Sequence, residues 1–247
     1  MLTVHHLGIS QSERIVWLCE ELGIAYKLQV HTRAPLLAPD SLKSLPGNSL
    51  GKAPFIVDDD VTLSESGAIC DYIIAKYGNG KLAPELGDKN YVDFLYWYHY
   101  ANATLQPLMM NVMFIEMAEL PPGAPSTEMA EKRLQAALRH IDEGLAKNKW
   151  LAGDELTTAD ILSVYSLTTQ RYYGPLVSLK PYGNIVRYLS DVGRRPAYKR
   201  AMELGDPEME PLLRADAPSM TIFATGGIES DVWRKSDLET DEKGASD

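Results

Sequence analysis

Hydrophobic and polar positions change their period several times over the first eighty residues. Residues 2–6 and 26–31 are typical of short strands. Between them, the polar run 10–13 opens a helix with an apolar face made of Ile15, Leu18, Cys19 and Leu22. Gly23 then stands where a left-handed cap at the helix C-terminus is expected.

The crossover that follows is long and contains proline. It leads to two short strands, at 54–58 and 61–63, and then to a helix from about residue 65 to residue 77. The order is strand, helix, strand, crossover, strand, strand and helix. This order predicts a mixed sheet with helices packed on it, an α/β fold.

The pattern breaks at 78–80 and again over 84–87, where glycine and proline accumulate, and this predicts a domain boundary. Beyond it the sequence favours helices, beginning with a long aromatic-rich one over 90–119. An α/β domain over residues 1–82 is therefore expected to be followed by an all-α bundle over residues 90–204.

Thr157 and Asp160 have the spacing of a capping box, in which each side chain bonds a backbone N–H group of the first helical turn. The flanking Leu156 and Ile161 suit a hydrophobic staple. This motif predicts a buried helix start with a structural role.

The net charge of −10 is spread unevenly along the chain. From Gly205 onward there are eleven Asp or Glu and four Lys or Arg residues, so residues 205–247 predict an acidic, mobile tail. The apolar stretch Met220-Thr221-Ile222-Phe223 is the exception, and the sequence leaves open whether it packs on the helical domain. The remainder of the chain is nearly neutral, which argues against binding to nucleic acid, because that requires a basic surface.

Several features are typical of a cytoplasmic protein. No apolar stretch is long enough to span a bilayer, so no membrane partner is expected. The first twenty residues lack the pattern of a signal peptide. The two cysteines, Cys19 and Cys70, lie in apolar helical patterns and are expected to be free, buried thiols.

Four short motifs follow one another along the chain. They are Gly51-Lys52-Ala53-Pro54-Phe55, Leu63-Ser64-Glu65-Ser66-Gly67-Ala68-Ile69, Trp150 to Asp154 with Thr157 to Asp160, and Arg195-Pro196-Ala197-Tyr198. As an ordered set, they resemble the cytosolic glutathione transferases, most of all the fungal-type, yeast-like members related to the theta and phi serine enzymes. The resemblance implies a thioredoxin-like domain, a helical domain, a homodimer, and conjugation of glutathione to a hydrophobic electrophile in detoxification. It implies no cofactor beyond glutathione as co-substrate.

The resemblance also assigns roles to individual residues. Pro54 takes the place of the family's cis-proline, and the backbone of Ala53 would pair with the cysteinyl part of glutathione. Ser66 would hold the γ-glutamyl carboxylate, since the N-terminus of a helix favours an anion. Glu65 would face the glutathione ammonium group, and Lys52 the glycyl carboxylate. The alternatives are a helix cap for Glu65 and Ser66, and a solvated surface side chain for Lys52.

The thiol of glutathione needs a hydrogen-bond donor, because a free thiol with a pKa near 8.5 is mostly protonated at neutral pH. By resemblance, Ser10 is the catalytic residue that donates to the thiolate, and Ser12 is the runner-up. The residues themselves offer an alternative, since Ser10 and Glu13 have the spacing of a capping box. The two roles of Ser10 are compatible, because a hydroxyl can accept one hydrogen bond while it donates another.

The second substrate is less well specified. Candidate pocket residues are His5, His6, Leu7, Ile9, Met109, Met110, Met113 and Phe114. Core packing is the alternative for each of them. In the long helix, Asn102-Ala103 replaces the Glu-Gly of many fungal-type relatives, which bears on the second substrate.

No spacing of Cys, His and carboxylate residues indicates a metal site. The same glutathione site also leaves other functions open. These are a glutathione-dependent peroxidase or isomerase, and a non-catalytic glutathione-binding scaffold.

Overall fold

The computed structural model describes residues 1–236 of the chain. Its first part is a four-stranded sheet with the strand order β2-β1-β3-β4. The strands are β1 (Leu2–Leu7), β2 (Lys27–His31), β3 (Phe55–Asp58) and β4 (Val61–Ser64). β1 runs parallel to β2 and antiparallel to β3, and β4 runs antiparallel to β3. The predicted mixed sheet is confirmed.

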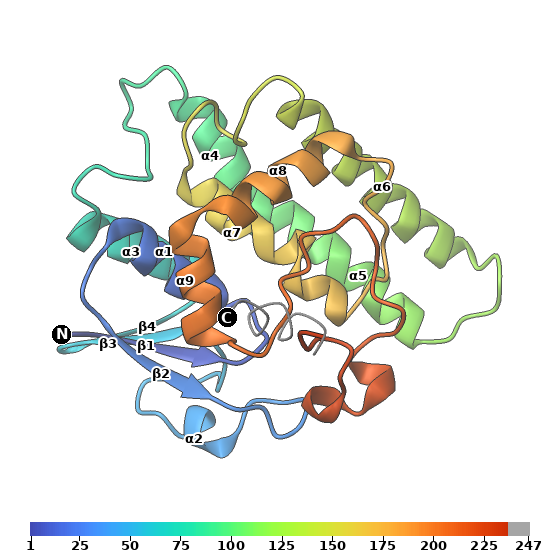
Figure 1. The fold of residues 1–247 in the computed structure, drawn as a ribbon, viewed down its shortest axis with the longest axis horizontal. Coiled ribbons are helices and arrows are strands. Elements are labelled where there is room, and N and C mark those ends of the chain that lie inside the picture. The colour runs from blue at the N-terminus through green and yellow to red at the C-terminus, as the bar shows by residue number, and fades with distance from the viewer. Residues whose placement is uncertain (237–247) are drawn as a thin grey trace, which may run out of the picture.

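Three helices cover this sheet. α1 (Glu13–Leu22) and α3 (Ser66–Ile73) lie on the face toward the rest of the molecule, and the short α2 (Asp40–Lys43) lies on the opposite face (Figure 1). α3 continues into a π-helical turn, η1 (Ile74–Gly78). Gly23 ends α1 with a φ of +65°, the left-handed cap expected from the sequence.

The second part is built from helices, as predicted. They are α4 (Tyr91–Tyr100), α5 (Gln106–Met117), α6 (Pro125–Leu145), α7 (Thr158–Leu167), α8 (Gly183–Arg194) and α9 (Pro196–Gly205). The long helix expected over 90–119 is divided, because a π-helical segment, η2 (Ala101–Leu105), joins α4 to α5. A 3₁₀ turn, η3 (Thr169–Tyr172), follows α7.

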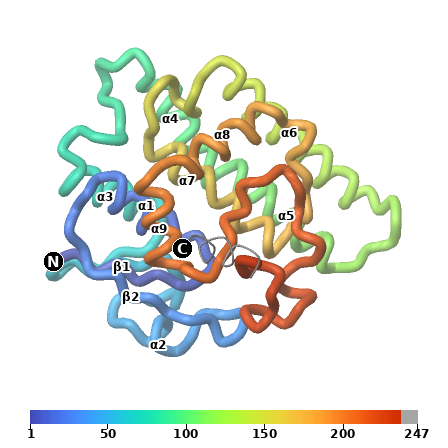
Figure 2. Tube along the Cα trace, viewed as in Figure 1, coloured from blue at the N-terminus to red at the C-terminus, as the bar shows by residue number. Residues whose placement is uncertain are grey.

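α1 joins the two parts, since it contacts the sheet on one side and α7 and α9 on the other (Figure 2). The rings of Trp17 on α1 and Tyr198 on α9 meet edge to face, with their centroids 5.0 Å apart. Arg195, at the start of α9, donates to both carboxylate oxygens of Glu21 at 2.6 and 2.7 Å. Most buried apolar side chains of both parts form one continuous core, and Leu7, Leu42 and Ala53 form a small separate cluster.

The start of α7 has the predicted capping box between Thr157 and Asp160. The Asp160 carboxylate also accepts hydrogen bonds from the N–H of Leu151 at 2.9 Å and the hydroxyl of Tyr188 at 3.2 Å. Burial raises the pKa of Asp160 to about 6. This carboxylate therefore ties a helix start to a loop and to α8, a structural role.

Residues 206–236 differ from the mobile tail expected over 205–247. They cross both parts of the molecule (Figure 1), where Ile222 N–H donates to Tyr172 O at 2.8 Å and Ile228 N–H donates to Pro35 O at 3.3 Å. Their apolar side chains explain the difference, because Met209, Leu212, Ile222 and Trp233 are buried. Residues 237–247 of the predicted tail lie outside the described residues.

Arg171 in η3 fastens this segment. Its side chain is fully buried, and its guanidinium donates to the backbone carbonyls of Arg214, Ala215 and Asp216 at 2.7–3.1 Å.

No helix within residues 1–236 is long and apolar enough to cross a membrane. The domain limits 1–82 and 90–204 stay predictions.

Candidate active site

The loop between β1 and α1 turns sharply at Ile9. Its φ of +52° is an outlier for a β-branched residue and costs about 1–3 kcal/mol. Three side chains hold it: its N–H donates to Asp206 Oδ1 at 2.8 Å, and its carbonyl accepts from the Tyr173 hydroxyl at 2.6 Å and Arg33 Nη2 at 3.0 Å. Ser10, the next residue, is therefore positioned by contacts from distant parts of the chain.

Ser10 and Ser12 differ in their access to solvent. Ser10 is 5% exposed, whereas Ser12 is fully buried. Their hydroxyl oxygens lie 2.7 Å apart, and the Ser12 N–H donates to Ser10 Oγ at 3.2 Å. Ser12 Oγ also accepts from the Leu7 N–H at 3.0 Å and contacts Nδ1 of His6 at 2.9 Å. Ser10 is thus the better placed of the two to reach a ligand.

The alternative capping box between Ser10 and Glu13 does not form within the described residues. α1 begins at Glu13, and no side-chain hydrogen bond caps it. The Glu13 carboxyl group instead accepts from the Thr169 hydroxyl at 2.6 Å. Burial raises the pKa of Glu13 to about 8, so the group is mostly neutral at pH 7. The Ser10 hydroxyl is therefore bonded to Ser12 and has no part in a capping box with Glu13.

The loop before β3 presents the backbone of Ala53. The Ala53–Pro54 peptide bond is cis. Buried Asn48 fixes the loop: its Oδ1 accepts from the Lys52 N–H at 3.2 Å, and its Nδ2 donates to the Lys52 carbonyl at 3.1 Å. The Ala53 carbonyl accepts a long hydrogen bond of 3.4 Å from Gln11 Nε2.

Ser66 is the first residue of α3 and is 6% exposed. Its hydroxyl accepts from Arg14 Nη1 at 3.2 Å and from Asn102 Nδ2 at 3.3 Å. Glu65 precedes it with an exposed side chain and a φ of +72°, a further strained backbone position. A helix N-terminus and a guanidinium therefore converge on one hydroxyl, an arrangement that favours an anion.

Arg14 is an unusual group at this position. Its guanidinium is buried, and burial lowers its pKa to about 10, so it stays charged at neutral pH. Nη1 also donates to Gln11 Oε1 at 3.1 Å, whereas Nε and Nη2 have no hydrogen-bond partner among the described residues. Tyr165 packs its ring on the guanidinium at 5.0 Å. The cation therefore has two hydrogen-bond donors, Nε and Nη2, without a partner among the described residues, and its Nη1 donates to Ser66.

The sequence-derived candidates thus meet around the start of α1. A chain of hydrogen bonds leads from Ala53 through Gln11, the residue after Ser10, and Arg14 to Ser66. Lys52 and Glu65 lie at its rim with exposed side chains. Sequence reasoning did not single out Gln11 and Arg14. The available signal was a charged residue, Arg14, in the first turn of α1 and directly before the apolar run 15–19.

A cavity of about 220 Å³ opens beside this site. Gln11 lines it together with Met110 and Met113 of α5 and Tyr165 of α7. Of the other expected pocket residues, His5 and His6 are buried in hydrogen bonds with His31 and Asp206, Met109 is in the core, and Phe114 is exposed. The two methionines nearest the loop therefore remain as candidates for contact with a second ligand.

Comparisons with known proteins find the same family in both parts of the chain. "Glutathione S-transferase, N-terminal domain" matches residues 5–81, and "Glutathione S-transferase, C-terminal domain" matches residues 100–196. Glutathione S-transferase 3 of Schizosaccharomyces pombe is 33% identical over 82% of this chain and 87% of its own length.

Solved structures of the same family also resemble this chain. A glutathione S-transferase crystal structure from Actinobacillus pleuropneumoniae is 30% identical, with a TM-score of 0.74 over 83% of this chain and 93% of that one. A family member from Pseudomonas fluorescens, solved with two glutathione molecules bound, is 21% identical with a TM-score of 0.68 over 82% and 92% of the two chains. This second likeness concerns the fold alone.

Proposed function

Because this chain belongs to the glutathione S-transferase family, we propose that it conjugates the thiolate of glutathione to a hydrophobic electrophile. Fold and family make it a glutathione transferase, and the acceptor is the part that we infer. The observation that carries the proposal is the hydrogen-bond chain that runs from Ala53 through Gln11, the residue after Ser10, and Arg14 to Ser66.

Each part of glutathione has a counterpart in this arrangement. The γ-glutamyl carboxylate binds the Ser66 hydroxyl and the N-terminus of α3, with the Arg14 charge behind it. The cysteinyl backbone pairs with Ala53, where its amide replaces the long contact of Gln11. Glu65 and Lys52, at the rim, face the glutathione ammonium group and the glycyl carboxylate.

The thiolate is stabilised by Ser10. A hydrogen bond to a charged group contributes about 1.5–3 kcal/mol, which lowers the pKa of the thiol by roughly one to two units. The fully buried Ser12 supports Ser10 from behind. The electrophile enters the cavity lined by Met110 and Met113, whose flexible side chains suit acceptors of different shape.

We test this function with purified protein, a glutathione-affinity matrix and chlorodinitrobenzene as the electrophile. We expect retention on the matrix and conjugation that is lost when Met110 and Met113 are both replaced by Asp. Retention without conjugation of any electrophile in a screen would instead support a glutathione-binding scaffold. Turnover with hydroperoxides alone would support a peroxidase, and turnover with an isomerase substrate alone would support an isomerase.

The biological setting follows from the same proposal. A conjugating enzyme of this family is expected to act in detoxification in the cytoplasm as a homodimer. Sedimentation of the purified chain tests the dimer, and a tagged chain in fractionated cells tests the location.

A further inference from the structure

Behind Ser10, a row of hydrogen bonds leads into the interior of the protein. Ser10 Oγ lies 2.7 Å from Ser12 Oγ, which lies 2.9 Å from Nδ1 of His6. Nε2 of His6 lies 3.0 Å from Oδ2 of Asp206, just after α9. His6 and Ser12 are fully buried, and Ser10 and Asp206 are nearly so. A carboxylate, an imidazole and two hydroxyls thus form one row that ends at the proposed thiol site.

The carboxylate determines which nitrogen of neutral His6 carries the proton. An ionised carboxylate only accepts hydrogen bonds, so Nε2 donates to Asp206 and Nδ1 is left as an acceptor. Because Nδ1 accepts, the Ser12 hydroxyl donates to it at 2.9 Å, a shorter contact than the 3.3 Å to the Leu7 carbonyl. Ser12 Oγ accepts from the Leu7 N–H, and its second lone pair accepts from the Ser10 hydroxyl. In this state Ser10 presents a lone pair to an approaching thiol.

We propose that His6 is the acceptor for the thiol proton of glutathione, reached through Ser10 and Ser12. The proposal rests on the function proposed above. When the S–H bond breaks, its proton passes to Ser10, the Ser10 proton passes to Ser12, and the Ser12 proton binds Nδ1 of His6. The products are a thiolate, to which Ser10 now donates, and an imidazolium against Asp206. Each serine loses one proton and gains another, so the only net change in the row is the proton gained by His6.

Two glycines allow the acid to approach this closely. A Cβ on Gly205 would lie 3.1 Å from Nε2 of His6, and a Cβ on Gly8 would lie 3.3 Å from Oδ1 of Asp206. Both distances are shorter than most real Cβ contacts, so a side chain at either position would displace the pair. Oδ1 of Asp206 also accepts from the Ile9 N–H at 2.8 Å, which fixes the carboxylate.

Other titratable groups surround this pair without adding a charge at neutral pH. They are His31 on β2, Glu13 on α1, Tyr173 after η3 and Tyr198 on α9. Burial disfavours the charged form of each, lowering the pKa of His31 and raising the pKa of the other three. The Arg33 guanidinium donates to the Gly8 and Ile9 carbonyls. Asp206 is therefore the carboxylate that balances an imidazolium at His6.

The test compares thiolate formation with proton release when glutathione binds. Thiolate is read from its ultraviolet absorbance, and released protons from an indicator dye in weak buffer about one pH unit above the ordinary histidine pKa of 6.5. S-methylglutathione, which has no thiol proton, supplies the correction for protons exchanged by the rest of the ligand. We expect the wild-type protein to form thiolate while it releases much less than one proton per thiolate.

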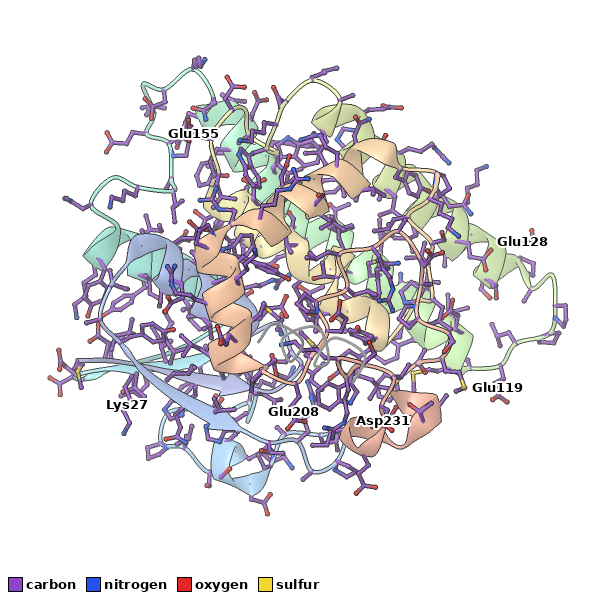
Figure 3. The ribbon with its side chains drawn as sticks, in the orientation of Figure 1. Lys27, Glu119, Glu128, Glu155, Glu208 and Asp231 are labelled. Carbon is purple, nitrogen blue, oxygen red and sulfur yellow. The ribbon has the colours of Figure 1, made fainter. Side chains whose placement is uncertain are left out.

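Two variants and one spectrum identify the acceptor. In His6→Gln the thiolate that remains should release a full proton. Asp206→Asn should raise the apparent pKa of the bound thiol and slow conjugation about tenfold for each unit. Its control is Asp231→Asn, on the exposed surface of the same segment (Figure 3), which should leave conjugation unchanged. An imidazolium signal from His6 should appear in ¹⁵N spectra with glutathione and not with S-methylglutathione.

The outcomes separate this inference from the function on which it rests. Full proton release by the wild-type protein, with normal thiolate formation, would overturn the role of His6 and leave the proposed function intact. Proton retention in a folded His6→Gln protein would also overturn it. If that variant does not fold, the ¹⁵N spectrum of the wild-type protein decides. Glutathione binding without any thiolate would contradict the proposed function itself.

Discussion

Ile9 holds a backbone conformation that β-branched residues rarely adopt, and this conformation directs the neighbouring Ser10 hydroxyl. The hydroxyl of Tyr173 contributes the shortest of the contacts that maintain it. Tyr173→Phe should lower the free energy of unfolding by about 1 kcal/mol and also reduce conjugation, because the loop carrying Ser10 relaxes. Melting temperature and kcat/KM are the measurements.

Tyr172→Phe is the matched control for this change. It removes a similar hydroxyl-to-carbonyl bond, of 2.8 Å to Glu210, on the far side of the same turn. It should lower stability by a similar amount and leave kcat/KM unchanged. Equal loss of activity in both variants would show that Ile9 has no special role.

Ser10 itself should matter more for chemistry than for stability, since its hydroxyl forms no capping box with Glu13 and bonds only to Ser12 within the described residues. Ser10→Ala should raise the apparent pKa of bound glutathione and lower conjugation by roughly ten- to a hundredfold. The pH dependence of thiolate absorbance in the complex is the measurement. Unchanged absorbance would transfer the donor role to another group.

Ser66→Ala, in contrast to Ser10→Ala, should affect the binding of glutathione more than the rate of conjugation. The Ser66 hydroxyl anchors a part of glutathione that does not react, so its loss should raise KM for glutathione strongly and change kcat less. Calorimetry of glutathione binding checks the affinity directly. An unchanged affinity would contradict the placement of the γ-glutamyl carboxylate.

Glu13 makes stability depend on pH. Burial raises its pKa from 4.5 to about 8 in the folded state, so the folded protein binds the proton more tightly than the unfolded chain. The free energy of unfolding should therefore fall, by up to about 1.4 kcal/mol per pH unit, as pH rises through this window. Glu13→Gln should remove that contribution. Denaturant titrations at pH 5 to 9 give the free energy of unfolding at each pH. The same dependence of this free energy on pH in both proteins would contradict the assignment.

At the scale of elements, hydrophobic period identified the strands and most helices, because each buries one face against a neighbour. It did not reveal that the long helix is interrupted at Ala101–Leu105, since a π-helical turn leaves the apolar pattern almost unchanged. The segment after α9 was expected to be mobile apart from the stretch 220–223, and the structure shows more of it packed. Its buried residues Ile222 and Trp233 lie in short apolar stretches within a polar, glycine-containing sequence, and they show no helical or strand period.

That segment leads to a prediction about truncation. A chain that ends after Ala217 loses the burial of Ile222 and Trp233, which should cost at least about 3 kcal/mol. The melting temperature should then fall by roughly 6–12 °C. A chain that ends after Ser236 keeps every described contact and is the control. Equal melting temperatures for the two truncated chains would show that the segment contributes nothing.

At the scale of the whole molecule, sequence order decided which parts of the site could be foreseen. Ala53 and Ser66 lie in motifs whose order along the chain resembles a known family, and Ser10 was assigned by the same resemblance. Gln11 and Arg14, close to Ser10 in the sequence, contact Ala53 and Ser66 in the structure. Asp206 has no such motif. Its hydrogen bond to His6 spans 200 residues of sequence, so only the packing of α9 on α1 brings the two groups together.

That separation of 200 residues also has a meaning in time. Ribosomes add about 5–20 residues per second, so Asp206 is made about 10 to 40 s after His6. Throughout this interval the nascent chain carries the histidine and both serines while their carboxylate partner has not yet been translated. The row of hydrogen bonds is therefore among the last contacts that a newly made molecule can complete.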